Sequence, residues 1–126
     1  MQMYPEIKRF VQETLGCSCP EDVFTEIEYQ KACAGFPERR IKVADRLLIY
    51  IINMDGKSDI QEVVDSALAR GVTERDNNGL NRFRLVLAAS RPDELRTLAV
   101  LAFKSSGYAD EKTHLHIVNT GDVEGF

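Results

Sequence analysis

Apolar residues recur at the spacing of an amphipathic helix, every three or four positions, in three stretches of the chain. These stretches are residues 4–15, residues 59–70 and a segment that starts at Pro92 and stops before Gly107. The second stretch is the clearest, because Ser58 and Gln61 form a capping box in front of it and Gly71 follows its last residue. We therefore predict three helices, each with one apolar stripe turned toward a common core.

Four other stretches carry the pattern of β-strands, in which every second residue, or every residue, is apolar. They lie at about residues 25–31, 41–54, 82–89 and 113–119. The second stretch is apolar without interruption over residues 47–52 and is rich in isoleucine. This composition predicts a central strand that is covered on both faces.

Residues 20–31 fit two interpretations. Phe24 and Ile27 are spaced as on a helix, whereas Ile27 and Tyr29 alternate as they would in a strand. We favour one helical turn over residues 20–24, followed by the strand.

The order of these elements, helix-strand-strand-helix-strand-helix-strand, predicts an α/β fold, with α+β as the alternative. Strand-helix-strand units from residue 41 onward imply right-handed crossovers and a mixed, largely parallel sheet of about four strands with about three helices. The earliest strand is expected to join as an antiparallel hairpin partner. Because 126 residues is the usual size of one domain, we expect a single domain over residues 1–126 with a loose tail at 120–126.

The charge balance narrows the range of partners. The formal net charge is -4, which opposes a role based on bulk attraction to nucleic acid or to anionic lipid. The apolar run at residues 47–52 is too short to span a membrane, and the first ten residues lack the apolar run of a signal peptide. We therefore expect a cytoplasmic protein with no membrane partner, and we disfavour nucleic acid as a ligand.

Two cysteines lie one residue apart in the stretch GCSCP, residues 16–20, and the third is Cys33. An odd number of cysteines in a chain without an export signal indicates reduced thiols. If Pro20 opens a helical turn, Cys19 is its cap, and its thiolate faces free backbone N–H groups that favour ionisation. A disulfide between Cys17 and Cys19 would be strained and easily reduced, so the pair suits a redox dithiol better than a structural bridge.

The same three thiols are candidate metal ligands. Cys17, Cys19 and Cys33, joined by one histidine of the stretch HLH, would supply the three sulfurs and one nitrogen that zinc accepts. Their spacing differs from that of zinc fingers and ferredoxins, although zinc and an iron–sulfur cluster both stay open as cofactors. The competing interpretation is that Cys17 and Cys33 are small buried apolar residues and that Cys19 lies in a loop.

Two further patterns in the sequence have simpler explanations than a ligand site. His114 and His116 share one face of the last predicted strand, where both could reach one ion, but histidines on a half-exposed strand are more often solvated. The stretch GKS at residues 56–58 follows a strand, but a phosphate-binding loop requires a second glycine where this chain has Ile51. We therefore interpret GKS as a turn before a helix.

Basic residues also cluster near the predicted strands. They are Arg39, Arg40, Lys42 and Arg46, and Arg82 and Arg84 add to the basic count elsewhere. We interpret the run at residues 39–46 as a solvated strand edge that discourages edge pairing. The acidic total charge and the lack of stacking aromatic residues disfavour nucleic acid as its ligand.

The sequence contains no Ser-His-Asp order, no metalloprotease helix and no dinucleotide-binding glycine pattern. Our leading hypothesis is therefore a small cytoplasmic non-catalytic α/β module for binding or assembly, whose exposed strand edge offers a route to a protein partner or a homo-oligomer. The alternative is a thiol site at Cys17, Cys19 and Cys33 that binds zinc or an iron–sulfur cluster, or that cycles as a redox dithiol.

Overall fold

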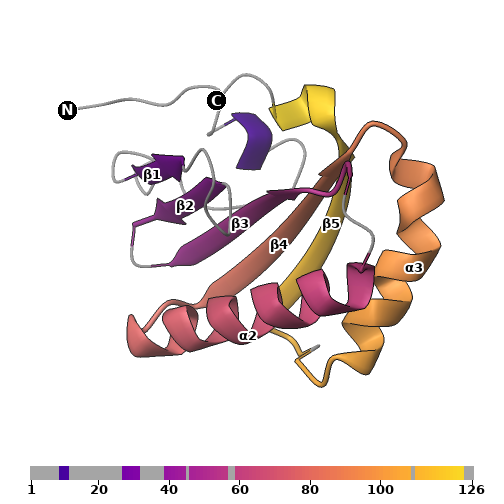
Figure 1. Ribbon diagram of the computed structural model, residues 1–126. Helices are drawn as coiled ribbons and strands as arrows, with labels where there is room; N and C mark the ends of the chain where they lie inside the picture. The colour runs from indigo at the N-terminus through magenta and orange to yellow at the C-terminus, as the bar shows by residue number, and fades with distance from the viewer. Residues whose placement is uncertain are drawn as a thin grey trace.

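The computed structural model describes residues 9–11, 27–31, 39–44, 46–56, 59–108 and 110–123. The elements in these residues are β1 (Ile27–Lys31), β2 (Arg39–Val43), β3 (Leu47–Asn53), α2 (Ile60–Asn77), β4 (Arg82–Ala89), α3 (Pro92–Ser105), β5 (Thr113–Asn119) and the 3-10 helix η3 (Thr120–Val123). Figure 1 shows a sheet crossed on one side by α2, with α3 beside it at the β5 end.

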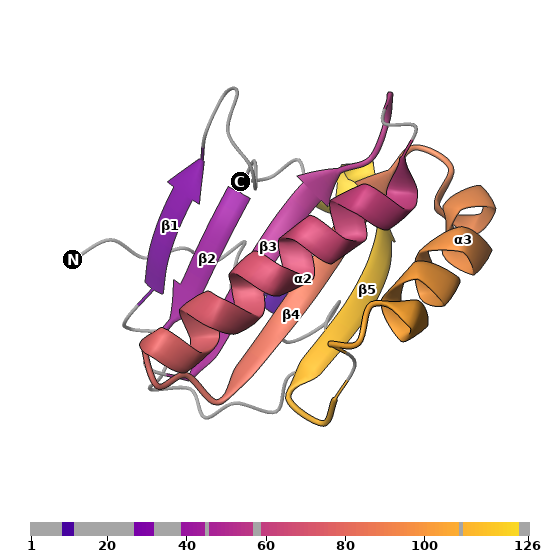
Figure 2. The same ribbon diagram turned by 60° about the horizontal axis from the view of Figure 1, so that its bottom comes forward.

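The five strands lie in the spatial order β1-β2-β3-β4-β5. The β1–β2 and β2–β3 pairs are antiparallel, whereas the β3–β4 and β4–β5 pairs are parallel. Figure 2 shows α2 lying over the middle of the sheet and α3 along its β5 side. The fold is therefore α+β, with a mixed sheet whose β1 edge is antiparallel.

The prediction of a largely parallel α/β sheet with four strands and three helices is wrong. The described residues form five strands, because the segment predicted as one strand over residues 41–54 contains a hairpin, and two α-helices, α2 and α3. Val43 pairs with Leu47 across a tight turn, in which the Arg46 amide donates to the Val43 carbonyl at 3.2 Å. Ala44 adopts a positive φ of 51°, a conformation more typical of glycine or asparagine, so this alanine gave no sign of the turn.

Helix α2 also differs from its prediction. It continues through Asn77, and Gly71, the expected end of the helix, lies buried in its interior. A Cβ atom at Gly71 would come within 2.1 Å of the Phe83 ring, so the glycine allows β4 to pack closely against the helix. The N-cap is Asp59, whose side chain accepts from the Glu62 amide at 3.0 Å, while Ser58 lies outside the described residues.

The remaining predicted elements in the described residues are confirmed. Strands form at β1, β4 and β5, and α3 begins at Pro92. Residues 47–52 of β3 are all buried, as expected of a central strand. The predicted helix over residues 4–15 is described only at residues 9–11, and the predicted helical turn at 20–24 lies outside the described residues.

Each face of the sheet carries its own apolar cluster. On the helix side, residues such as Leu48, Phe83 and Leu85 pack under α2 and α3. On the other side, the cluster includes Val86 and also Val123 from η3. The first four residues of the expected loose tail are thus ordered as η3, whereas residues 124–126 lie outside the described residues. Within the described part of the chain, no helix combines the length and hydropathy required to cross a membrane.

Candidate functional site

The three cysteines lie outside the described residues, so the thiol site stays a prediction. Among the residues that are described, no group of three or more histidine, cysteine, aspartate and glutamate side chains is placed to hold a metal ion. The prediction that His114 and His116 share one face of a strand is confirmed, since β5 is a regular strand with both in alternate positions. Their ring nitrogens lie next to arginine side chains.

Two arginines of β4 and two histidines of β5 form a cluster on the sheet face opposite α2 and α3. We call Arg82, Arg84, His114 and His116 the Arg–His cluster. Parallel pairing places Arg84 directly beside His114, and alternation turns all four side chains to the same face as Val86. The intervening residue Phe83 points the other way, into the core under α2.

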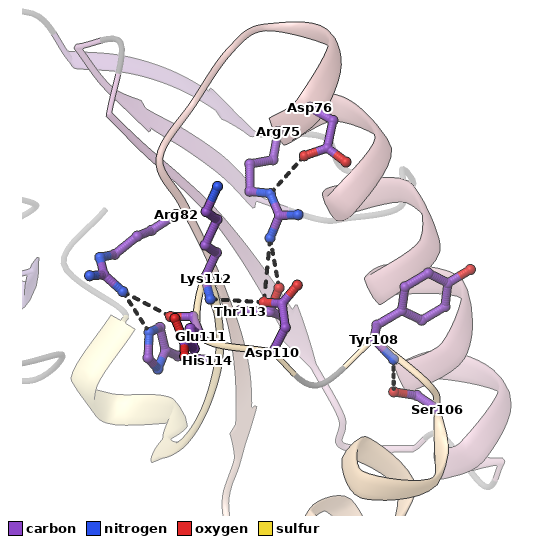
Figure 3. A network of polar contacts seen from close by, with 10 residues as sticks. All are labelled: Arg75, Asp76, Arg82, Ser106, Tyr108, Asp110, Glu111, Lys112, Thr113 and His114. Carbon is purple, nitrogen blue, oxygen red and sulfur yellow. Dashed lines mark hydrogen bonds and ion pairs between the residues drawn. The ribbon is translucent and has the colours of Figure 1, made fainter.

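Each arginine of the cluster contacts one histidine. Nη1 of Arg82 lies 3.2 Å from Nε2 of His114, and Nη1 of Arg84 lies 2.7 Å from Nε2 of His116. A guanidinium group can only donate, so each imidazole accepts through Nε2 and carries its proton on Nδ1. Figure 3 shows the Arg82–His114 contact, together with the hydrogen bond from Arg82 to the Glu111 carbonyl at 2.9 Å.

The surroundings keep both imidazoles neutral. Burial, followed by the positive charge of Arg84 and the neighbouring His114, lowers the pKa of His116 to about 4. The pKa of His114 is also lowered, by burial and by the charges of Arg84 and Arg82, against opposing effects of the Glu111 backbone and Asp110. At neutral pH, the charge of the cluster therefore resides on the two guanidinium groups.

Arg82 and Arg84 place two positive charges on this part of the face. The pKa of Arg84 is lowered, first by burial and then by the nearby charge of Arg82, although an arginine side chain stays protonated in a protein. Two cations held on adjacent positions of one strand face attract an anion, and a half-buried guanidinium strengthens that attraction because water screens it less.

Two arginines on the helix side, Arg40 and Arg75, have carboxylate partners. Arg40 on β2 forms an ion pair with Glu74 of α2, and the Tyr50 hydroxyl donates to the same carboxylate. Burial alone would raise the pKa of Glu74, but these hydrogen bonds lower it, so the group stays ionised. A groove of about 570 Å³ lies beside Tyr50 and Glu74, but both oxygens of Glu74 are already engaged. The groove therefore supplies no reactive carboxylate.

Arg75, at the end of α2, also has carboxylate neighbours. It is only 5% exposed, and it donates to the Thr113 hydroxyl at 2.9 Å and to Asp76 at 3.1 Å (Figure 3). Asp110 lies 3.7 Å away. The contacts with Thr113 and Asp110 hold the end of α2 against the start of β5, which indicates a structural role for Arg75.

The sequence interpretation of the basic run at residues 39–46 as a solvated strand edge is wrong for Arg39, Arg40 and Lys42, because their strand, β2, lies between β1 and β3. Arg82 and Arg84, which the sequence analysis only added to the basic count, lie on β4, between β3 and β5. The matching patterns Arg-Phe-Arg and His-Leu-His were visible in the sequence, but only the strand order and register bring them together.

Comparisons with protein-family models, with curated proteins and with solved structures find no match for this chain.

Proposed function

We propose that this protein is a small cytoplasmic non-catalytic binding module whose ligand presents a compact oxyanion, a carboxylate or a phosphate, to the Arg–His cluster. The observation that carries the proposal is the placement of Arg82 and Arg84 on one face of β4, each touching a neutral imidazole of β5. A protein partner or a second copy of the chain remains part of the proposal as a further ligand of the module.

The chemistry of the cluster suits an oxyanion. Guanidinium groups present planar pairs of N–H donors that match carboxylate and phosphate oxygens. In the free protein, each imidazole occupies one such donor as a neutral acceptor. An arriving oxyanion is a stronger acceptor and can replace the imidazole, because hydrogen bonds between ionised groups are about twice as strong as neutral ones.

The histidines then add to binding rather than compete with it. Near an anion, a protonated imidazole is favoured, so binding raises the pKa of both rings and each can donate to the ligand. By linkage, the affinity for the anion rises as the pH falls toward the histidine pKa values of the free protein. Asp110 is the carboxylate that acts on His114 in the opposite sense to the arginines, and it moderates this effect.

The same geometry supports a binding role over a catalytic one. In each Arg–His pair, the imidazole Nε2 faces a guanidinium donor, so that nitrogen is not available as a general base. The low pKa of His116 also leaves it a weak base at neutral pH.

Calorimetric titration with inorganic phosphate tests the proposal. The variant Arg82→Met should weaken binding about tenfold, because one hydrogen bond to a charged group contributes about 1.5 kcal/mol or more. Arg96→Met is the matched control, since Arg96 is exposed on α3 and pairs with Asp93 at 3.7 Å. Binding that is absent in the natural protein, or that both variants weaken equally, would overturn the assignment of the ligand site.

The second candidate is the thiol site at Cys17, Cys19 and Cys33. It is favoured by the concentration of all three cysteines in the first 33 residues of the chain. Elemental analysis and thiol titration of protein purified without oxygen test this candidate. Retained zinc or iron would support it, whereas metal-free protein with three thiols of ordinary reactivity would reject it.

A further inference from the structure

The outer side of α3 exposes two leucines. Leu98 is 56% exposed and Leu101 is 59% exposed, and they are the large apolar residues that stand out in this way among the described residues. The buried side of the same helix is formed by Leu95, Ala99 and Ala102. Leu98 and Leu101 lie three residues apart on one helix, so they form one contiguous apolar patch outside the core of the described residues, which makes the patch a candidate contact surface.

Opposite charges lie at the two ends of this exposed surface. Glu94 precedes Leu98 by one helical turn, and Lys104 follows Leu101 by three residues, so the four side chains lie along one side of α3. All four are exposed. Glu94 also lies 3.5 Å from Arg91 within the chain, but a solvent-exposed pair of this kind contributes little and is readily exchanged.

We propose that α3 is a self-association surface, on which the α3 of a second copy packs antiparallel about a two-fold axis. The axis would pass between Leu98 and Leu101, so that each leucine meets the other leucine of the second copy. The same axis brings Glu94 of each copy beside Lys104 of the other. The pattern is therefore complementary to itself, as a two-fold interface requires.

The spacing of the side chains supports a single axis for both kinds of contact. Glu94 and Lys104 are centred on residue 99, and Leu98 and Leu101 are centred between residues 99 and 100. The overlapping segment spans about 15 Å of helix. A parallel arrangement would instead place Glu94 beside Glu94 and Lys104 beside Lys104, which is unfavourable.

Other occupants fit the surface less well. An anionic membrane would favour basic residues alone around the leucines, whereas α3 carries charges of both signs, with Asp93 and Glu94 in its first turn and Arg96 and Lys104 after them. The small apolar area implies a weak interface, below the size of a standard stable dimer. We therefore expect a concentration-dependent dimer with a Kd on the order of 100 µM.

Sedimentation equilibrium of the whole chain over a range of concentrations tests this surface. The natural protein should pass from monomer to dimer, and Leu101→Asp should weaken the association at least tenfold. Ser66→Asp, which adds the same charge at an exposed position on α2, should leave it unchanged. Circular dichroism checks that each variant is folded.

Charge reversal separates the proposed geometry from unspecific association. Glu94→Lys and Lys104→Glu should each weaken the dimer, and the double variant should restore it, since the two charges then attract again across the axis. A protein that stays monomeric at every concentration, a dimer that Leu101→Asp leaves intact, or a monomer that binds vesicles of anionic lipid through these leucines would overturn the proposal. This test is independent of phosphate binding, so either proposal can fail alone.

Discussion

The two faces of the sheet stabilise their arginines in different ways. On the helix side, Arg40 and Arg75 lie within ion-pair distance of Glu74 and Asp76. On the opposite face, Arg82 contacts a neutral imidazole. An arginine that pairs with a carboxylate therefore holds two elements of the fold together. An arginine that contacts a neutral histidine keeps its positive charge uncompensated by that neighbour. This contrast is the basis for assigning the ligand site to the second face.

The largest expected effect concerns the close packing of the helix-side face. Gly71→Val should lower the free energy of unfolding by about 3 kcal/mol, because a side chain there overlaps the Phe83 ring, which a Cβ would approach within 2.1 Å. Chemical denaturation measures the change. Ala69→Val, on the same helix but only half-buried, is the control and should cost less than about 1 kcal/mol. Equal losses in both variants would mean that the close approach of β4 is not what Gly71 provides.

A matched pair of arginine substitutions tests the contrast itself. Arg75→Met should lower the free energy of unfolding by about 2 kcal/mol, because it removes the buried hydrogen bond to Thr113 and the partly exposed one to Asp76. Arg82→Met, at an exposed position, should change it by less than about 0.5 kcal/mol. Denaturation curves of the two variants give the comparison. If the Arg82 variant proved the less stable of the two, the Arg–His cluster would have to be assigned a structural role.

Acidic pH should lower the free energy of unfolding through the protonation of His116. The pKa of His116 is about 4 in the folded protein and near its ordinary value of 6.5 in the unfolded chain. The unfolded state therefore takes up a proton first, so this group lowers stability as the pH falls from about 6.5 to about 4, and adds nothing further below that. The free energy of unfolding, measured as a function of pH, should fall less steeply over this range in His116→Asn than in the natural protein. An equally steep fall in the variant would exclude His116 as its cause.

Several strands and helices could be predicted from the sequence alone, whereas the Arg–His cluster could not. Alternation identified β4 and β5, and Pro92 marked the start of α3. The hairpin between β2 and β3 was missed because Ala44 takes a positive φ without glycine or asparagine. The end of α2 was missed because Gly71 serves packing against Phe83 rather than capping, and sequence alone does not distinguish the two uses of glycine.

The Arg–His cluster was only half visible in the sequence. The pattern in β5 places His114 and His116 on one face, and that part was predicted. Their partners, Arg82 and Arg84, depend on which strand lies beside β5 and on the register between the two, which are long-range properties of the sheet. The three cysteines lie outside the described residues, and their prediction as a thiol site rests on sequence.

The most direct test of the account is an NMR pH titration of the His116 ring with and without inorganic phosphate. We expect a pKa of about 4 in the free protein and a clear rise when phosphate is present, because the anion offsets the charge of Arg84 and stabilises the protonated ring. A pKa near 6.5 that phosphate does not change would contradict the account, because it would mean that neither burial nor Arg84 disfavours the protonated ring and that the anion does not bind beside it.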